Sequence, residues 1–445
     1  MGWAQVSSNR WERALTGFEE YLVLWANKSK NVSHTNQQYT MFSKVKVEIN
    51  LPNIQSALKH AWKQMRYEEP DIASTFEGDK KVYVIPDEAA LQAWLDSTFV
   101  VTDITDADEI QRSGGKAEQS RLFYLPQTSE LALRMPHYNI DGVGLSIWWD
   151  KFFNHLLYPK SESTFGGEHR NLAVPLPEAL GNNETPTPEE TERATAQVME
   201  YAAKLPGIGM VSKAGKAPSG QCRNIEHRFS PELTRAIIQA CKEKDMSVTS
   251  AVHAAYGSVL MKHADSQSNT SRYTTVTTFD LRDYLSESFR KTAVTNSTTT
   301  LPFSIDLPVS FSQLAQALSD RYRHGIRSNP QTLENVGTYN NVLIGILKTP
   351  QAQAVPVPTD GFVSSLGVVE KHLDRQYGSV VTVKDYKISL DVVLGTDTLH
   401  VFSFRDQLRV VHSFNDGYEE PHVIREYLND IEAVLREELL HEPRV

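Results

Sequence analysis

The feature that most constrains this chain is a ten-residue pattern that occurs twice. Residues 133–142 read Leu-Arg-Met-Pro-His-Tyr-Asn-Ile-Asp-Gly, and residues 408–417 read Leu-Arg-Val-Val-His-Ser-Phe-Asn-Asp-Gly. Both fit Leu-Arg-x-x-His-x-x-x-Asp-Gly, and each ends an apolar, strand-like run just before an amphipathic helical one. Two copies in the same context predict two related halves, each with a strand that turns into a helix at the motif.

Strand and helix signals alternate along the chain, which predicts an α/β fold. The predicted strands cover residues 39–50, 81–85, 122–125, 130–137, 273–279, 298–305, 387–394, 399–404 and 407–414. Helical spacing of apolar residues predicts helices that begin near residues 53 and 231, and others over 142–157, 188–205, 247–264 and 420–440.

The length and the proline pattern predict two domains. A chain of 445 residues is too long for one small core. Prolines and glycines accumulate between residues 158 and 223, interrupted by one predicted helix, which is typical of a crossover between domains. We therefore predict an N-terminal domain over residues 1–175, a crossover linker over 176–224 and a C-terminal domain over 225–445.

The composition argues against several classes of protein. A net charge of −10 disfavours nucleic-acid binding, because phosphate contacts need concentrated Lys and Arg. No run approaches 18 apolar residues and the N-terminus lacks a signal-peptide core, so we expect a cytoplasmic protein without membrane association. Cys222 and Cys241 are the only cysteines, and the 14 histidines lack metal-ligand spacing, so neither a disulfide framework nor a metal site is expected.

The first motif carries the candidate general base, His137. A neutral imidazole at the end of a strand can accept a proton near neutral pH, and Gly142 lets the backbone turn tightly into the next helix. That helix carries four aromatic residues, which in such helices belong to the core more often than to a ligand wall: Trp148, Trp149, Phe152 and Phe153.

The second motif offers a rival base, His412. Its Asp416-Gly417 runs into Tyr418-Glu419-Glu420-Pro421, which has the composition of an acidic, solvated segment. We therefore interpret this copy as the remnant of a duplication, kept for a turn and a helix start, and expect His137 to be the catalytic copy.

Asp141 is expected to have an architectural role. The turn after the strand should aim its carboxylate away from His137, inward toward a cation, and the predicted cation is Arg282 in Asp280-Leu281-Arg282. An inward Asp–Arg pair adds little net stability, but breaking it would leave a buried charge and distort the loop. The alternative for Arg282 is an exposed arginine in a loop.

These residues resemble the superfamily of CoA-dependent acyltransferases, which includes chloramphenicol acetyltransferase, plant BAHD acyltransferases, fungal trichothecene-type O-acetyltransferases and nonribosomal peptide condensation domains. The resemblance covers nearly the whole chain and rests on the motif at His137, the small-residue helix at 247–264, Asp280–Arg282 and Ser364-Ser365-Leu366-Gly367. It implies two similar α/β domains, each a two-layer sandwich of the chloramphenicol acetyltransferase type, facing each other across a solvent tunnel. It also implies that His137 is the live histidine and that Asp141, Gly142 and Arg282 support it.

Differences between this sequence and the motifs of two subfamilies reduce the number of subfamilies that it can resemble. Condensation domains usually carry a second His directly before the motif, where this chain has Pro136. BAHD enzymes carry a late Asp-Phe-Gly-Trp-Gly, of which Asp374-Arg375-Gln376-Tyr377-Gly378 keeps only the Asp and one Gly. The remaining match is to the fungal O-acyltransferases of secondary metabolism.

The expected reaction is O-acyl transfer from acyl-CoA, as co-substrate, to a hydroxyl of an apolar secondary metabolite, with acetyl as the expected group and no bound cofactor. Ser365, Thr298 or Thr300 is expected to contact the oxyanion or the substrate. No Gly-x-Ser-x-Gly nucleophile motif occurs, which fits direct transfer. The alternatives are a release or condensation enzyme that uses an acyl carrier protein, and a cyclase or degenerate binding module on the same fold. A monomer is expected.

Overall fold

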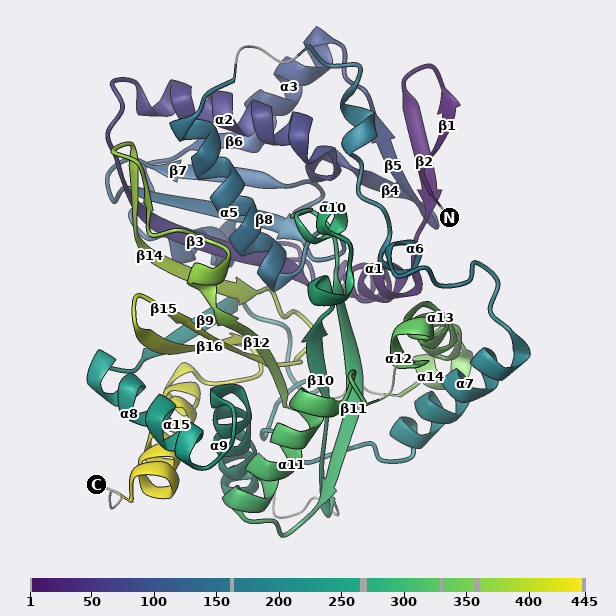
Figure 1. Cartoon of the computed structure of the whole chain (residues 1–445), viewed down its shortest axis with the longest axis vertical. Helices are drawn as coiled ribbons and strands as arrows, with labels where there is room; N and C mark the ends of the chain where they lie inside the picture. The colour runs from purple at the N-terminus through teal and green to yellow at the C-terminus, as the bar shows by residue number, and fades with distance from the viewer. Residues whose placement is uncertain (1, 161–163, 265–269, 329–330, 356–360, 442–445) are drawn as a thin grey trace. The chain divides into compact units, whose positions relative to one another are not determined.

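A computed structural model of the chain describes residues 2–160, 164–264, 270–328, 331–355 and 361–441, which form two compact units (Figure 1). The first unit comprises Met1–Pro186, Asp280–Ser297 and Val369–Asp391. The second unit comprises Thr187–Phe279, Thr298–Val368 and Val392–Val445. The first unit therefore combines the N-terminal part of the chain with two segments from its second half.

The first unit is built on a six-stranded sheet with the strand order β13-β14-β3-β8-β7-β6. Neighbouring strands are antiparallel except β6 and β7, which run parallel. The strands are β13 (Gln376–Tyr377), β14 (Val381–Leu390), β3 (Thr40–Ile49), β8 (Glu130–Pro136), β7 (Arg121–Leu125) and β6 (Phe99–Val101). The inner strand β8 ends directly before the first motif histidine.

Three helices supply the apolar layer that packs on this sheet: α2 (Ile54–Glu68), α3 (Glu88–Thr98) and α5 (Gly142–Leu157). Side-chain caps fix where they begin, because Asn53, Asp87 and Asp141 each accept a backbone N–H from the first turn. The rest of the unit includes α1 (Gly17–Ser29), α4 (Ala107–Ser113), α6 (Leu176–Ala179), α10 (Glu287–Arg290) and a sheet of β1 (Ala4–Ser7), β2 (Arg10–Ala14), β5 (Lys80–Val84) and β4 (Thr75–Glu77).

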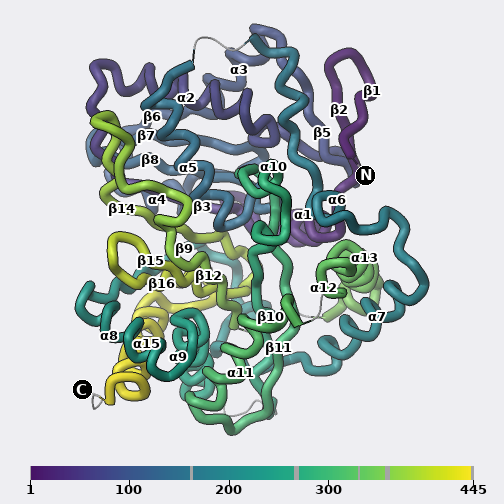
Figure 2. The backbone as a smooth tube through the Cα atoms, in the orientation of Figure 1, coloured from purple at the N-terminus to yellow at the C-terminus, as the bar shows by residue number. Residues whose placement is uncertain are grey.

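Strand β14 brings a late segment of the chain into the sheet of the first unit. It pairs antiparallel with β3 from Val381↔Ile49 to Leu390↔Met41. In Figure 2 the yellow-green β14 lies beside the purple β3. Asp391, directly after β14, donates its backbone N–H to Thr40 O at 2.8 Å and accepts from Tyr39 N at 2.9 Å.

The second unit has its own six-stranded sheet, with the strand order β11-β10-β12-β15-β16-β9. The strands are β11 (Thr298–Asp306), β10 (Arg272–Asp280), β12 (Phe362–Val368), β15 (Thr398–Phe404), β16 (Gln407–Asn415) and β9 (Cys222–Arg228). β12 runs parallel to β10 and β15, whereas β16 is antiparallel to β15 and β9. The second motif begins in β16.

Four helices share one apolar core with this sheet: α8 (Pro231–Glu243), α9 (Val248–His263), α11 (Phe311–His324) and α15 (Pro421–Leu440). Small residues of α9, among them Ala251, Ala254 and Ala255, are fully buried there, which allows close helix packing. The unit also contains α7 (Pro188–Ala202), α12 (Gln331–Glu334), α13 (Val336–Leu347) and α14 (Pro350–Gln353), and α7 packs on α13.

The α/β fold class predicted from the sequence is confirmed, with a layer of helices packed on a sheet in each unit. The domain limits at 175 and 225 differ from the compact units in that residues 280–297 and 369–391 join the first unit. The strand predicted at 387–394 is observed at Val381–Leu390, because the apolar run Val392–Leu394 lies beyond the last residue paired with β3. Across the described part of the chain, no helix has the length and apolarity to cross a bilayer.

Candidate active site

His137 lies between the end of β8 and the start of α5 and is held by its backbone on both sides. Its N–H donates to Tyr39 O at 2.9 Å, and its carbonyl accepts from Asn296 Nδ2 at 2.8 Å. Between Leu131 and Ile140, His137 is the only residue that is not buried. The fold therefore fixes the backbone of His137, the one residue of this stretch that stays partly exposed.

The side chain of His137 has a defined tautomer. Its Nδ1 lies 2.8 Å from the backbone oxygen of Ile140, and because a carbonyl oxygen only accepts, Nδ1 carries the hydrogen. Burial lowers the pKa of His137 below its usual 6.5, against the opposing effects of the Ile140 hydrogen bond and of Asp141. The ring is therefore neutral at pH 7, and Nε2 has a free lone pair that can accept a proton.

Asp141 uses both carboxylate oxygens to join α5 to residues 280–297. Oδ1 accepts from Gly144 N at 2.7 Å, which caps α5, and Oδ2 accepts from Ser297 N at 2.7 Å. Arg282 Nη1 lies 3.0 Å from Asp141 Oδ1. Asp141 is 1% exposed, so these partners replace the water that a carboxylate would otherwise hold.

Arg282 is buried between two carboxylates. It is 2% exposed, which excludes the alternative of an exposed loop arginine, and its Nη1 lies 3.0 Å from Asp280 Oδ1 as well as from Asp141. Burial by itself lowers the pKa of Arg282, but Asp141 and Asp280 outweigh burial and raise it. The guanidinium is thus a permanent charge that fixes the direction of Asp141.

Gly144 lets the backbone of the 280–297 segment approach the first turn of α5. A Cβ at this position would collide with the backbone oxygen of Ala293 and would lie 3.3 Å from Arg282 Nη2. Glu69 holds the same segment from another side, because its carboxylate accepts from Ala293 N and Val294 N at 3.1 Å each. The 280–297 segment is therefore held against the first turn of α5 and by Glu69, the residue that follows α2.

The aromatic residues of α5 belong to the core of the first unit. Trp148, Trp149, Phe152 and Phe153 have no exposed surface and pack on one another with ring centroids 5.0–5.9 Å apart. This packing supports α5 and does not form a wall for a ligand.

The second motif has different surroundings. His412 in β16 has no exposed surface, and its Nε2 lies 3.6 Å from Asp397 Oδ2, beyond hydrogen-bond distance. The expectation that residues 418–421 form a solvated acidic segment is wrong at its start, since Tyr418 and Glu419 are only 5% and 4% exposed. Burial and the nearby Asp397 raise the pKa of Glu419 to about 8.

The three hydroxyl residues proposed for the oxyanion belong to the second unit. Ser365 Oγ in β12 shares a hydrogen bond of 2.8 Å with Thr249 Oγ1 at the start of α9. Thr298 and Thr300 lie at the beginning of β11 and are partly exposed. Within the first unit the structure brings together His137, Asp141, Gly142 and Arg282.

Several residues of the site were not identified from the sequence. Asn296 and Ser297 directly precede the predicted strand at Thr298, and their contacts with residues 137 and 141 join positions far apart in the chain. The Asn-Ser pair at a strand start was the available signal, but nothing local links it to the motif. Among the described residues, no three His, Cys, Asp or Glu side chains group as metal ligands.

Two fungal proteins are similar to the chain over almost its whole length. O-acetyltransferase pigM of Monascus ruber is 25% identical over 459 residues, which cover 99% of this chain and 87% of pigM. Acetyltransferase pigO of Monascus ruber is 27% identical over 458 residues, which cover 99% of this chain and 98% of pigO. No protein-family model matches the chain.

Solved structures share the fold. The trichothecene 15-O-acetyltransferase TRI3 of Fusarium sporotrichioides superposes with a TM-score of 0.82 at 17% identity and covers 97% of both chains. The first condensation domain of the CDA synthetase superposes with a TM-score of 0.66 at 13% identity, over 96% of this chain and 97% of that domain. The fold is thus common to acetyl-transferring enzymes and to condensation domains.

Proposed function

We propose that this chain, an acyltransferase related to fungal acetyltransferases, transfers an acyl group from acyl-CoA to a hydroxyl of an apolar secondary metabolite, with His137 as the general base. The observation that carries the proposal is the hydrogen bond from His137 Nδ1 to Ile140 O at 2.8 Å, which leaves Nε2 as the proton acceptor. The partial exposure of His137 and its lowered pKa support the same role.

The reaction proceeds by direct attack. The acceptor hydroxyl oxygen forms a bond to the thioester carbonyl carbon while His137 Nε2 takes the hydroxyl proton. The tetrahedral intermediate then collapses, the carbon–sulfur bond breaks, and the imidazolium returns the proton to the departing CoA thiolate. The products are an ester and free CoA thiol, and no covalent intermediate with the protein forms.

Asp141 does not relay this proton. Its carboxylate is committed to Gly144 N, Ser297 N and the Arg282 guanidinium. Its proposed role is to set the start of α5 and so the direction in which the motif loop presents His137. Ser365, Thr298 and Thr300 remain the proposed hydroxyl donors for the oxyanion or the substrate.

The direct test is incubation of the purified chain with acetyl-CoA, longer acyl-CoAs and a metabolite extract of the organism that produces the protein. We expect release of free thiol that depends on the extract, and one metabolite whose mass grows by one acyl unit. Thiol release without a mass gain would indicate hydrolysis, and neither change with any donor would contradict acyl-CoA as the co-substrate.

A second candidate function takes the acyl group from an acyl carrier protein. The likeness to the CDA condensation domain over 96% of the chain favours it, since such domains act within peptide synthetases. Pro136 at the position before the motif histidine weighs against peptide-bond formation. A carrier-bound acyl thioester that reacts faster than the matching acyl-CoA would support this candidate. The cytoplasmic location and the monomeric state remain predictions of the sequence.

A further inference from the structure

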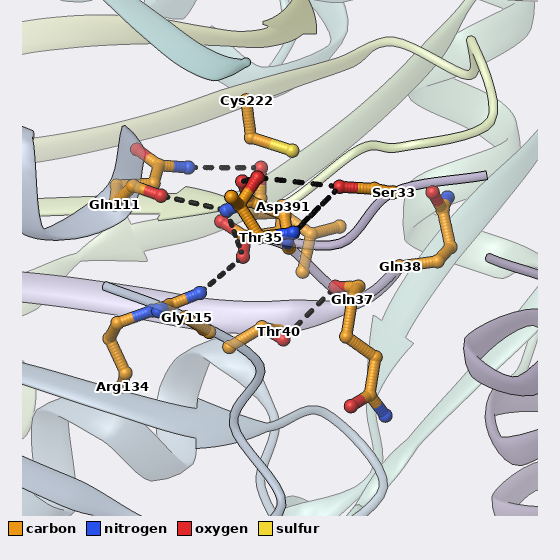
Figure 3. Close-up of polar contacts among 12 residues, drawn as sticks. Ser33, Thr35, Gln37, Gln38, Thr40, Gln111, Gly115, Arg134, Cys222 and Asp391 are labelled. Atoms are coloured by element: carbon orange, nitrogen blue, oxygen red, sulfur yellow. Dashed lines mark hydrogen bonds and ion pairs between the residues drawn. The ribbon is translucent and has the colours of Figure 1, made fainter. Parts of the chain in front are cut away.

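The arginine of the repeated motif has no part in the mechanism above, yet it forms a buried ion pair in the first unit. Arg134 lies in β8 three residues before His137 and is 1% exposed. Its Nη2 lies 2.6 Å from Oδ2 of Asp391, which has no exposed surface (Figure 3). Asn36 Nδ2 donates to the same carboxylate oxygen at 3.0 Å. A buried pair of this kind is a weak source of net stability, so its place beside the motif needs another explanation.

The guanidinium of Arg134 is held rigidly. Its Nη1 donates to the backbone oxygen of Gly115, and a Cβ at Gly114 would lie 2.6 Å from the same nitrogen. Gly115 adopts φ +78°, a conformation that glycine reaches without steric cost. The turn at residues 114–115 therefore packs against the guanidinium of Arg134 and holds it in place. The guanidinium in turn holds the carboxylate of Asp391.

Asp391 is linked to Tyr39 and Thr40 by backbone hydrogen bonds. Its carbonyl accepts from Tyr39 N at 2.9 Å and its N–H donates to Thr40 O at 2.8 Å. Asp391 thus has its side chain tied to β8 and its main chain tied to the segment that enters β3.

Tyr39 is in a strained conformation directly beside His137. Its φ is +62°, in the left-handed region that non-glycine residues seldom adopt. The carbonyl of Tyr39 accepts the backbone N–H of His137 at 2.9 Å, and the two rings meet edge to face at 6.4 Å. The strained residue, Tyr39, is therefore the one whose carbonyl accepts the backbone N–H of His137.

We propose that the Arg134–Asp391 pair, acting through Tyr39, is a positioning element that sets the backbone and ring of His137 for proton transfer. This inference rests on the proposed function of His137. The pair holds Asp391, Asp391 holds Tyr39 in its left-handed conformation, and Tyr39 holds His137. Because a small displacement of a base lowers the rate strongly, the pair acts on turnover as well as on folding.

The second unit contains a matched control. Arg409 occupies the same place in the second motif, is 1% exposed, and its Nη1 lies 3.5 Å from Glu226 Oε1. Removing the charge of Glu226 therefore weakens a contact of the buried arginine in the second motif, where the histidine is His412, together with the closer pair that Glu226 forms with Arg228 at 2.7 Å.

The test compares Asp391→Asn with Glu226→Gln in the full chain. Both substitutions keep the side-chain size and remove one charge. We expect Asp391→Asn to lower kcat by about 10- to 100-fold with KM within about 3-fold, and Glu226→Gln to change kcat by less than about 2-fold. Active protein is counted by its folded fraction, so that a loss of stability alone does not lower kcat. Equal losses of kcat in the two variants, or a lower Tm with unchanged kcat in Asp391→Asn, would overturn the proposal.

A second readout does not depend on activity. In protein with isotope-labelled histidine, the ring signals of His137 are identified by their absence from His137→Ala. Asp391→Asn should shift these signals and Glu226→Gln should not; no shift in either variant refutes the positioning role. If the wild type releases no thiol from any acyl-CoA, the proposed function fails, while the ring signals still decide whether the pair positions His137.

If Asp391→Asn does not fold, Tyr39→Gly tests the same proposal. Glycine adopts φ +62° readily, so folding should be preserved, while the loss of the ring and of backbone rigidity should lower kcat by about 10-fold. Unchanged kcat in this variant would contradict the role of Tyr39.

Discussion

The two motif histidines share ten-residue contexts but have different chemical surroundings. His137 keeps partial exposure and gives its Nδ1 hydrogen to Ile140 O, whereas His412 has no exposed surface and its ring nitrogens have no hydrogen-bond partner within the described residues. The hydrogen bond of His137 leaves its Nε2 lone pair free, and Nε2 of His412 lies 3.6 Å from a buried carboxylate, that of Asp397.

The aspartates differ in the same way. Asp141 directly precedes α5 and caps it through Gly144 N. Asp416 precedes α15 by several residues, and its carboxylate instead accepts from Gln221 N at 2.7 Å and pairs with Arg223. The shared motif therefore specifies a strand and a turn in both units, whereas its aspartate caps the following helix only in the first unit.

Replacing the two motif histidines should have the most unequal effects on turnover. His137→Ala should lower kcat by about 10³-fold, because general-base catalysis typically contributes 10²–10⁴-fold. His412→Ala should leave kcat per folded molecule within about 3-fold of the wild type, although the cavity lowers stability. Thiol release under saturating substrates measures both. A reversed order of the two effects would assign catalysis to the second motif.

The next effect compares the aspartates. Asp141→Asn leaves the buried Arg282 with Asp280 as its remaining carboxylate, so we expect a stability loss of up to about 3 kcal/mol and a clear loss of activity. Asp416→Asn affects a pair whose side chains are 39% and 20% exposed, and should cost less than about 1 kcal/mol. Denaturant unfolding gives both values, and equal costs would remove the distinction between the two aspartates.

A smaller effect tests the close approach at the first motif. Gly144→Ala would push a Cβ against Ala293 O, so we expect a loss of about 1–3 kcal/mol and lower kcat. The matched control is Gly345→Ala in α13, where a Cβ has open space and alanine should stabilise the helix by about 0.5–1 kcal/mol. Thermal unfolding of both variants checks the sign, and a stabilised Gly144→Ala would refute the close approach.

The smallest effect concerns the second motif alone. The pKa of Glu419 is about 8 in the folded chain, so between its ordinary pKa and pH 8 the folded state keeps a proton that the unfolded state has lost. This carboxyl therefore makes the fold less stable as pH rises through that window. Glu419→Gln should match the wild type at pH 5 and exceed its Tm by at least about 2 °C at pH 8.5. A Tm difference that does not vary with pH would contradict the burial of this proton.

The elements next to the motifs could be read from the sequence because local signals were strong. The helix at 142–157 was predicted with the bounds of α5, since Asp141, Gly142 and the apolar stripe mark its start and its face. Helix α11 was missed although Ser310 and Gln313 form a capping box before its buried residues.

Long-range pairing could not be read in this way. No local pattern in residues 381–390 predicts that β14 pairs with β3, or that Asp391 forms an ion pair with Arg134. The burial of Glu419 has a related cause: the acidic pair Glu419-Glu420 indicates solvent, but the packing that buries Glu419 near Asp397 exists only in the folded unit.

The proposed reaction requires His137 to act as the base in its neutral form. The pH dependence of kcat/KM, measured beside the titration of the His137 ring signals, tests it most directly. We predict an acid limb with a midpoint below the usual histidine value of about 6.5 that coincides with the His137 titration and is unchanged in His412→Ala. An acid limb that does not follow the His137 titration, or that moves in His412→Ala, would contradict the assignment of His137 as the base.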